Sequence, residues 1–314
     1  MKQFLFGTLL VMGAVLTVTA CKDDEETPKN IVELAQSNAN LSILVDAVVY
    51  TDLAATLSGT TEYTVFAPTN AAFTALLQSL GVAKITDVDK ATVKAILLNH
   101  VVAGEVKSGA ITTGYVKSLS PFGATTSTLS LYIAKSGSNV TVNKDVNVTT
   151  ADLDASNGVV HVVDKVITLP TIVNHALNNP NFSTLVAALT RSDLGVDYVT
   201  ILSGAGPFTV FAPTNDAFAA LLTELSAPNL AAIDAATLNK VLQYHVVSGA
   251  NVLAATLTEG QQVTTFQGGK FTINLAGGAK IKDLNNRTSN IIVTDVQGSN
   301  GVVHAIDKVL LPTL

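Results

Sequence analysis

Hydrophobic residues recur at a helical spacing in the first part of each half of this chain. Stripes at i, i+3, i+4 and i+7 occupy residues 41–48, 73–80 and 93–100. Equivalent stripes return at residues 182–189, 218–225 and 238–245. Residues at this spacing share one face of a helix, so each stripe predicts a helix with one buried face.

The spacing changes to two in residues 105–170 and again in residues 251–312. Leu129, Leu131 and Ile133 alternate with more polar neighbours before a turn rich in Ser, Gly and Asn. Such alternation predicts antiparallel strands joined by hairpins. Because helices precede strands in each half, each half is predicted to be an α+β unit and not an alternating parallel fold.

One heptad, Thr-Val-Phe-Ala-Pro-Thr-Asn, occurs at residues 64–70 and again at 209–215. Its first residues predict a strand that a proline ends, and its last two can cap the helix that follows. The chain is therefore a duplicated unit, and the heptad is expected to be a core junction. The residues expected in this structural role are Thr69, Asn70, Thr214 and Asn215.

Four histidines occupy repeated positions, and we expect a structural role for each. His100 and His245 end a helical stripe, so they are predicted to be buried neutral imidazoles. A metal ligand or general base is the alternative, but no second ligand lies nearby at a suitable spacing. His161 and His304 lie in Asn-Gly-Val-Val-His-x-x-Asp-Lys-Val, a strand apolar on both faces and thus central in a sheet. His161 and Asp164 are three apart and face opposite ways.

The N-terminus has the pattern of an export signal. An apolar stretch from Phe4 to about Val18 precedes the only cysteine, Cys21, and Val-Thr-Ala-Cys resembles the bacterial lipoprotein box. A plain signal peptide or a membrane helix is the alternative, but the run is shorter than the about 20 residues of a spanning helix. The predicted parts are a signal peptide (1–20), a lipidated Cys21 with a charged tether (21–29), and two domains (30–169 and 170–314).

Composition narrows the functional classes. Only 13% of residues are charged and 48% are hydrophobic, so Thr, Ser, Asn and Gly must build much of the surface. The net charge of −6 and the lack of any Lys/Arg run argue against nucleic-acid binding. No cysteine follows Cys21, so disulfides and thiol chemistry are excluded. The chain contains no nucleophile elbow, phosphate loop, His-Glu-x-x-His or calcium loop, which predicts no enzyme, no cofactor and no metal.

The repeated motifs together resemble fasciclin domains. The heptad, the pair Asn99-His100 or Tyr244-His245, and the closing strand occur in the same order twice, over residues 29–314. The resemblance implies two tandem wedge-shaped β-sandwiches flanked by helices, without cofactor or catalytic centre, that act in cell adhesion and matrix contact. Asn99 stands where many members have tyrosine.

In animal members of the family, adhesion through integrins has been linked to an Asp followed by an aliphatic residue before the closing strand. The matching positions are Asp152-Leu153 and Asp295-Val296. They are the candidate partner-binding residues that the resemblance implies. A role of each Asp in a turn is the alternative.

The sequence thus predicts a non-catalytic adhesion lipoprotein that binds a protein or polysaccharide matrix component and contacts the membrane through its lipid anchor only. It is expected in the outer membrane, exposed on the cell surface, with a periplasm-facing orientation as the other option. The alternative function is an accessory envelope lipoprotein that captures a glycan or small ligand for uptake. With no Trp and 5% aromatic residues, the usual sugar-stacking platform is poorly supplied.

Overall fold

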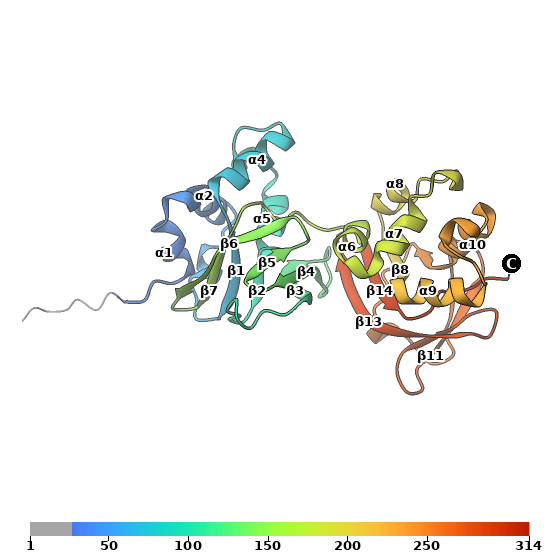
Figure 1. Ribbon diagram of the computed structural model, residues 1–314. Coiled ribbons are helices and arrows are strands. Elements are labelled where there is room, and N and C mark those ends of the chain that lie inside the picture. The colour runs from blue at the N-terminus through green and yellow to red at the C-terminus, as the bar shows by residue number, and fades with distance from the viewer. Residues whose placement is uncertain (1–26, 314) are drawn as a thin grey trace, which may run out of the picture.

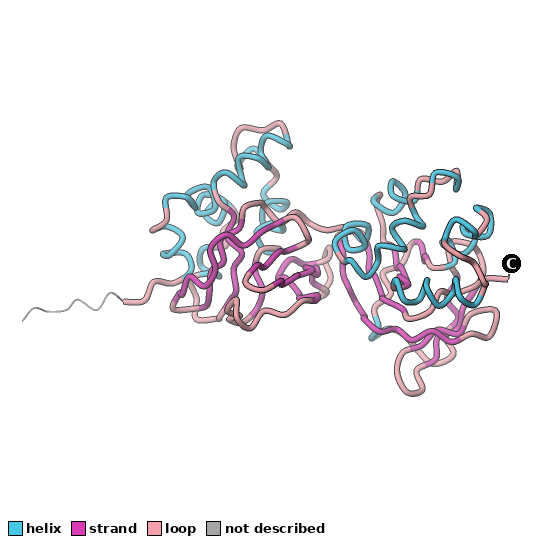
Figure 2. The backbone as a smooth tube through the Cα atoms, in the orientation of Figure 1, coloured by secondary structure: helices cyan, strands magenta, loops and turns pink. Residues whose placement is uncertain are grey.

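The structure, a computed structural model, describes residues 27–313. These residues form two domains that follow one another along a line and are joined by a short segment near Pro170 (Figure 1). In each domain, helices cover one side of a seven-stranded sheet (Figure 2). The two halves that share sequence motifs thus share one mixed α+β architecture.

The first domain closes its seven strands into a barrel. Its helices are α1 (Ile31–Gln36), η1 (Ala39–Leu41), α2 (Ser42–Tyr50), α3 (Ala54–Leu57), α4 (Asn70–Leu80), η2 (Ile85–Asp87) and α5 (Lys90–Leu98). Its strands are β1 (Tyr63–Pro68), β2 (Val101–Ala103), β3 (Gly114–Pro121), β4 (Thr128–Ser136), β5 (Asn139–Val142), β6 (Val146–Ala155) and β7 (Gly158–Val163).

The second domain repeats this order, with the sheet order β10-β11-β12-β13-β14-β8-β9. Its helices are α6 (Ile172–Asn178), η3 (Pro180–Phe182), α7 (Ser183–Leu189), η4 (Ser192–Leu194), α8 (Tyr198–Ser203), α9 (Asn215–Glu224), η5 (Leu230–Ala232), α10 (Ala235–Tyr244) and η6 (Ala254–Thr256). Its strands are β8 (Phe208–Pro213), β9 (Val246–Ser248), β10 (Gln262–Thr264), β11 (Lys270–Asn274), β12 (Lys280–Lys282), β13 (Thr288–Gly298) and β14 (Gly301–Ile306).

One strand pairing differs from the antiparallel pattern that the sequence predicts. The heptad strand β1 pairs in parallel with the closing strand β7, as β8 does with β14. A parallel pair needs a long crossover, and here everything between the two strands supplies it. The heptad strand and the closing strand of each half are therefore direct neighbours in its sheet.

The predicted helical stripes build the core on the helical side of each sheet. In β1, Val65 and Ala67 pack against the helices, whereas Phe66 points to the other side, into the barrel. One part of the expected stripe is wrong, because Leu80 is 51% exposed and its counterpart Leu225 is 47% exposed. Both residues lie where their helix ends, beyond the reach of the sheet.

Candidate functional site

The heptad residues hold helices together. Thr69 lies at the N-cap of α4, and its hydroxyl accepts a hydrogen bond from the amide of Ala72. Asn70 accepts one from the amide of Ile43 at 2.9 Å, which ties α4 to the start of α2. Thr214 and Asn215 make the equivalent contacts in the second domain. These four side chains satisfy backbone groups within the protein.

His100 and His245 lie in the core with both ring nitrogens engaged. The Nδ1 of His100 donates to the carbonyl of Ile96 at 2.7 Å, and its Nε2 accepts from the amide of Ile167 at 2.8 Å. His245 makes the equivalent bonds at 2.7 and 2.9 Å. Burial lowers the pKa of both residues to about 4, so both are neutral at physiological pH. No lone pair is left on either ring for a metal or a proton.

His161 and His304 are also buried, on the closing strands. The Nδ1 of His161 accepts from the amide of Asp152 at 3.2 Å, and its Nε2 donates to the carbonyl of Val106 at 3.0 Å. His304 holds the amide of Asp295 at 3.3 Å in the same way. Each histidine thus anchors the candidate Asp of its own domain. The sequence signal for this pair was the separation of nine residues, which is the same in both halves.

Both candidate Asp residues adopt a left-handed backbone conformation, with φ of 60° at Asp152 and 57° at Asp295. Each lies at an irregularity in the pairing of its strand with the closing strand. The carboxylate of Asp152 accepts from the amide and hydroxyl of Ser108, which lowers its pKa. Asp295 likewise accepts from the amide of Ala254 at 2.8 Å. In both domains the carboxylate fixes the loop that follows the short strand β2 or β9.

The two candidate pairs differ in exposure. The side chain of Asp152 is 36% exposed, and Leu153 is half-buried at an open end of the first domain. Val296 is only 2% exposed, and the carbonyl of Asp295 accepts a hydrogen bond from Lys117 of the first domain. Both Asp residues are therefore partly exposed, but Lys117 of the first domain binds the backbone of Asp295, and within residues 27–313 no hydrogen bond from the second domain reaches Asp152. Partner binding by either pair stays a prediction.

The contact between the domains is polar and aromatic. Tyr115 donates from its hydroxyl to the carbonyl of His175 at 3.3 Å, and their rings meet edge to face. The amide of Gln297 donates to the hydroxyl of Ser130 at 3.0 Å. Burial lowers the pKa of His175 to about 4 and also lowers the pKa of Lys117. The sequence analysis missed this interface because nothing in either half marks which face meets the other.

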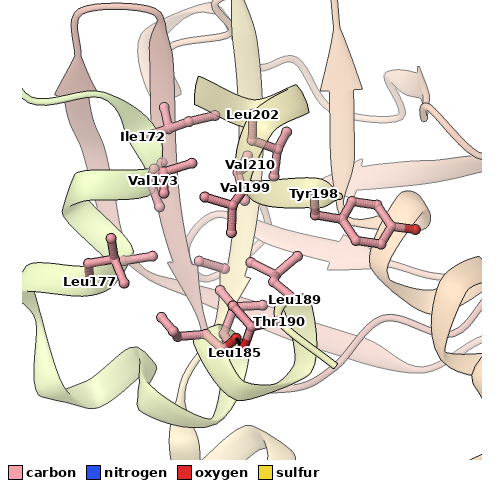
Figure 3. A pocket seen from close by; sticks show the side chains of 14 residues that line it. Ile172, Val173, Leu177, Leu185, Leu189, Thr190, Tyr198, Val199, Leu202 and Val210 are labelled. Atoms are coloured by element: carbon pink, nitrogen blue, oxygen red, sulfur yellow. Dashed lines mark hydrogen bonds between the residues drawn. The ribbon is translucent and has the colours of Figure 1, made fainter. Parts of the chain in front are cut away.

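An apolar groove opens between α6, α7 and α8 of the second domain. Figure 3 shows Leu177, Val199 and Leu189 around one shared space, with Ile172 and Leu202 above them in this view. The cavity measures about 40 Å³. Pockets for small molecules usually measure ~300–1,000 Å³, so this groove accepts an aliphatic group at most.

Within residues 27–313, no group of three or more His, Cys, Asp or Glu side chains is placed to hold a metal. In the same range, every helix is too short or too polar to cross a bilayer. The expected lipidation site Cys21, the signal peptide 1–20 and most of the tether lie outside the described residues.

Comparisons with known proteins agree with the duplicated architecture. A family model described as fasciclin domain matches residues 39–170 and 180–312. Protein sll1483 of Synechocystis sp. is 46% identical over 144 residues, which make up 46% of this chain and 74% of that protein. The cell surface glycolipoprotein MPB83 of Mycobacterium bovis is 35% identical over 146 residues, or 45% of this chain and 60% of that protein. A solved FAS1 domain pair from the insect cell adhesion molecule fasciclin I covers 89% of this chain and 95% of its own, with 20% identity and a TM-score of 0.49.

Proposed function

This chain belongs to the fasciclin domain family, and from that premise we propose that it is a lipid-anchored surface protein that holds one matrix component by binding alone. Proteins of this family are non-enzymatic adhesion proteins, and they bind matrix proteins or polysaccharides. The proposed partner is accordingly a protein or polysaccharide outside the cell. The proposed mechanism is the presentation of two domains on one tether, which permits avidity if both engage at once.

The observation that supports binding over chemistry is the state of the repeated histidines. His100, His161, His245 and His304 each use both ring nitrogens in hydrogen bonds to the backbone. A general base needs a free lone pair within reach of a substrate, and these rings are fully occupied inside the core. The outward surfaces are then the parts of the molecule free to act.

The anchor is proposed from the sequence. Val18-Thr19-Ala20-Cys21 resembles a lipoprotein box, and the similar MPB83 is named a cell surface glycolipoprotein. Acylation of Cys21 by more than one chain would give stable attachment, because a single chain holds only marginally. We place the protein in the outer membrane with its domains outside the cell.

The test uses cells that express the wild-type chain or Cys21→Ser. We expect the wild-type chain in the membrane fraction, cleaved by protease added to intact cells, and the variant released from the membrane. Wild-type cells should bind immobilised matrix proteins or polysaccharides, and cells with the variant should lose this binding. Equal membrane retention of the variant would refute the anchor, and equal adhesion of cells lacking the protein would refute the adhesive role.

Capture of a glycan or small ligand is the alternative function. The apolar groove of about 40 Å³ is too small for a sugar ring, and the larger hollows of about 460 and 600 Å³ lie open at the surface without a Trp to stack on a ring. Calorimetry of residues 29–314 with soluble sugars should therefore show no binding. Binding of a small sugar without binding of any macromolecule would favour the alternative.

A further inference from the structure

The two domains meet through faces that are not equivalent. The outward face of β3 and β4 in the first domain covers β13 and α6 of the second (Figure 1). Lys117 and Ser130, partners in the β3–β4 ladder, both contact β13 across this interface. A contact of this heterologous kind leaves one unmatched face of each type, one at each end of the molecule.

The first unmatched face is the outward side of β10, β11 and β12, the counterpart in the second domain of the face that covers β13. The strand register identifies its residues. In the first domain the partly buried Val116 and the buried Leu131 form a pair that lies next to Lys117 and Ser130. In the second domain the buried pair Val263 and Phe271 lies next to Thr264 and Lys270.

Each of the two equivalent faces therefore carries a lysine. In the first domain it is Lys117 on β3, and in the second domain it is Lys270 on β11. Lys280 and Lys282 of β12 add two further positive charges. The three strands β10 to β12 contain no Asp or Glu. We call the outward side of β10 to β12 the lysine face.

The second unmatched face lies at the far end of the first domain, where α1 and β7 point away from the second domain (Figure 1). Asp152 and Asp154 stand here in the positions that Asp295 and Gln297 occupy under the first domain. Glu105 joins them. Lys107 pairs with Asp154 at 2.9 Å, and the ammonium group of Lys135 donates to the carbonyl of Ser108, the residue that binds Asp152. The neutral amide of Gln297 has thus been replaced by a carboxylate where the face is exposed.

This acidic face carries a net charge of −3 + 1 = −2 over Glu105, Lys107, Asp152 and Asp154. Opposite charges on the two ends of one molecule steer association and fix its orientation. Here the two charged faces are the counterparts of the β3–β4 face and the β13–α6 face, which already contact each other inside the chain.

We propose that the lysine face of one chain docks on the acidic face of a second copy of this chain, head to tail. Lys270 takes the part that Lys117 plays inside the chain, and it approaches the backbone turn at Asp152 and the carboxylate of Asp154. Such a contact repeats without closing, so it builds a linear array.

This inference names one partner for the proposed adhesive role and rests on that role for its biological meaning. Its physical test does not depend on that role. The mature chain without lipid, residues 22–314, is studied by sedimentation velocity and light scattering over rising concentration. We expect reversible association that weakens at least fivefold when NaCl is raised from 50 to 500 mM, about one power of ten in salt, as expected for paired exposed charges.

Charge reversal locates the contact. Lys270→Glu or Asp154→Lys should each weaken self-association at least tenfold, whereas the control Lys94→Glu, an equal charge change on the exposed face of α5, should not. Mixing the Lys270→Glu and Asp154→Lys chains should restore association, because the unchanged lysine face of one chain meets the unchanged acidic face of the other. Circular dichroism of each variant checks that it is folded.

Three results would overturn the inference. A chain that stays monomeric up to millimolar concentration has no such contact. If Lys270→Glu and Asp154→Lys weaken association no more than the control Lys94→Glu does, the contact lies elsewhere on the molecule. A monomeric chain whose lysine face binds an anionic polymer, lost in Lys270→Glu, identifies a polysaccharide as the occupant. In the first and third cases cell adhesion can persist, so failure here is distinct from failure of the proposed function.

Discussion

Lys117 of the first domain donates a hydrogen bond of 2.5 Å to the carbonyl oxygen of Asp295 in the second domain. The same ammonium group also reaches Ser130 at 3.1 Å. A charged donor shared by both sides of a partly buried interface holds the domains at one angle. This contact reaches the backbone of one of the two Asp motifs.

We expect Lys117→Met to loosen the two domains without unfolding either. The charged hydrogen bond is worth about 1.5–3 kcal/mol, and its loss frees the interface more than the cores. Small-angle scattering should then show a broader distribution of distances, with the thermal midpoints little changed. Lys94→Met on the exposed side of α5 is the control. An unchanged distribution would show that the aromatic contacts of Tyr115 hold the domains by themselves.

Asp152→Ala and Asp295→Ala form a matched pair that tests the candidate binding motif. Each variant loses the hydrogen bond that fixes the loop after β2 or β9, so each should be destabilised by about 1–3 kcal/mol. Only Asp295 is also bound by the other domain, through its carbonyl oxygen. If the Asp152 motif binds a matrix partner, affinity measured at a temperature where both variants are folded should fall for Asp152→Ala alone. Equal affinity in both variants would leave the two residues with a structural role only.

We expect His100→Ala to lower stability by about 1–3 kcal/mol, because it leaves a cavity and strands the amide of Ile167 and the carbonyl of Ile96. His245→Ala should do the same in the second domain. Denaturant titration measures the change. Binding of a matrix partner should survive in protein that is still folded. Loss of binding with an unchanged thermal midpoint would instead indicate a functional histidine.

Gly158→Ala should prevent the central pairing of β1 with β7. A Cβ atom there would lie 1.9 Å from the carbonyl oxygen of Tyr63, and the φ of 136° disfavours any side chain. We expect the first domain to lose more than about 4 kcal/mol, while the second domain keeps its own unfolding transition. Gly109→Ala is the control, because nothing lies within 4 Å of its added Cβ. A Gly158→Ala chain with wild-type unfolding would refute this central pairing.

Stability should fall as the pH is lowered from about 6.5 to about 4. In the folded state burial lowers the pKa of His100, His175 and His245 to about 4, from an ordinary value of 6.5. Between these pH values the histidines are protonated in the unfolded chain and neutral in the folded chain, so acid favours unfolding. Each histidine can account for up to roughly 3 kcal/mol, and this loss is complete below the folded pKa.

Thermal melts at several pH values measure this effect. The slope of the free energy of unfolding against pH gives the number of protons taken up on unfolding. In His175→Asn this number should fall by about one, because the variant lacks one titrating group at the domain interface. A slope that matches the wild-type chain would show that His175 is protonated in the folded state.

Much of the fold can be predicted from the sequence, because the local spacing of hydrophobic residues indicates which face of each element is buried. The stripes at residues 73–80 and 93–100 predicted two helices and the buried position of His100. The repeated heptad predicted a strand that leads into a capped helix in both halves. These features depend on the few residues on either side of them, so the pattern itself is enough to predict them.

Other features were decided only when distant segments met. The sequence did not show that β1 pairs in parallel with β7, or that His161 contacts Asp152 and not Asp164. Those contacts join residues that the local sequence pattern around either one does not pair with the other.

The difference between the two Asp motifs was beyond the sequence for a further reason. Asp152 and Asp295 have the same backbone conformation and the same histidine contact. They differ because Lys117 of the first domain binds the carbonyl of Asp295, whereas the equivalent end of the first domain points away from the second (Figure 1). The sequence therefore determined the repeated unit, and the packing of one unit on the other determined which of its surfaces can meet a partner.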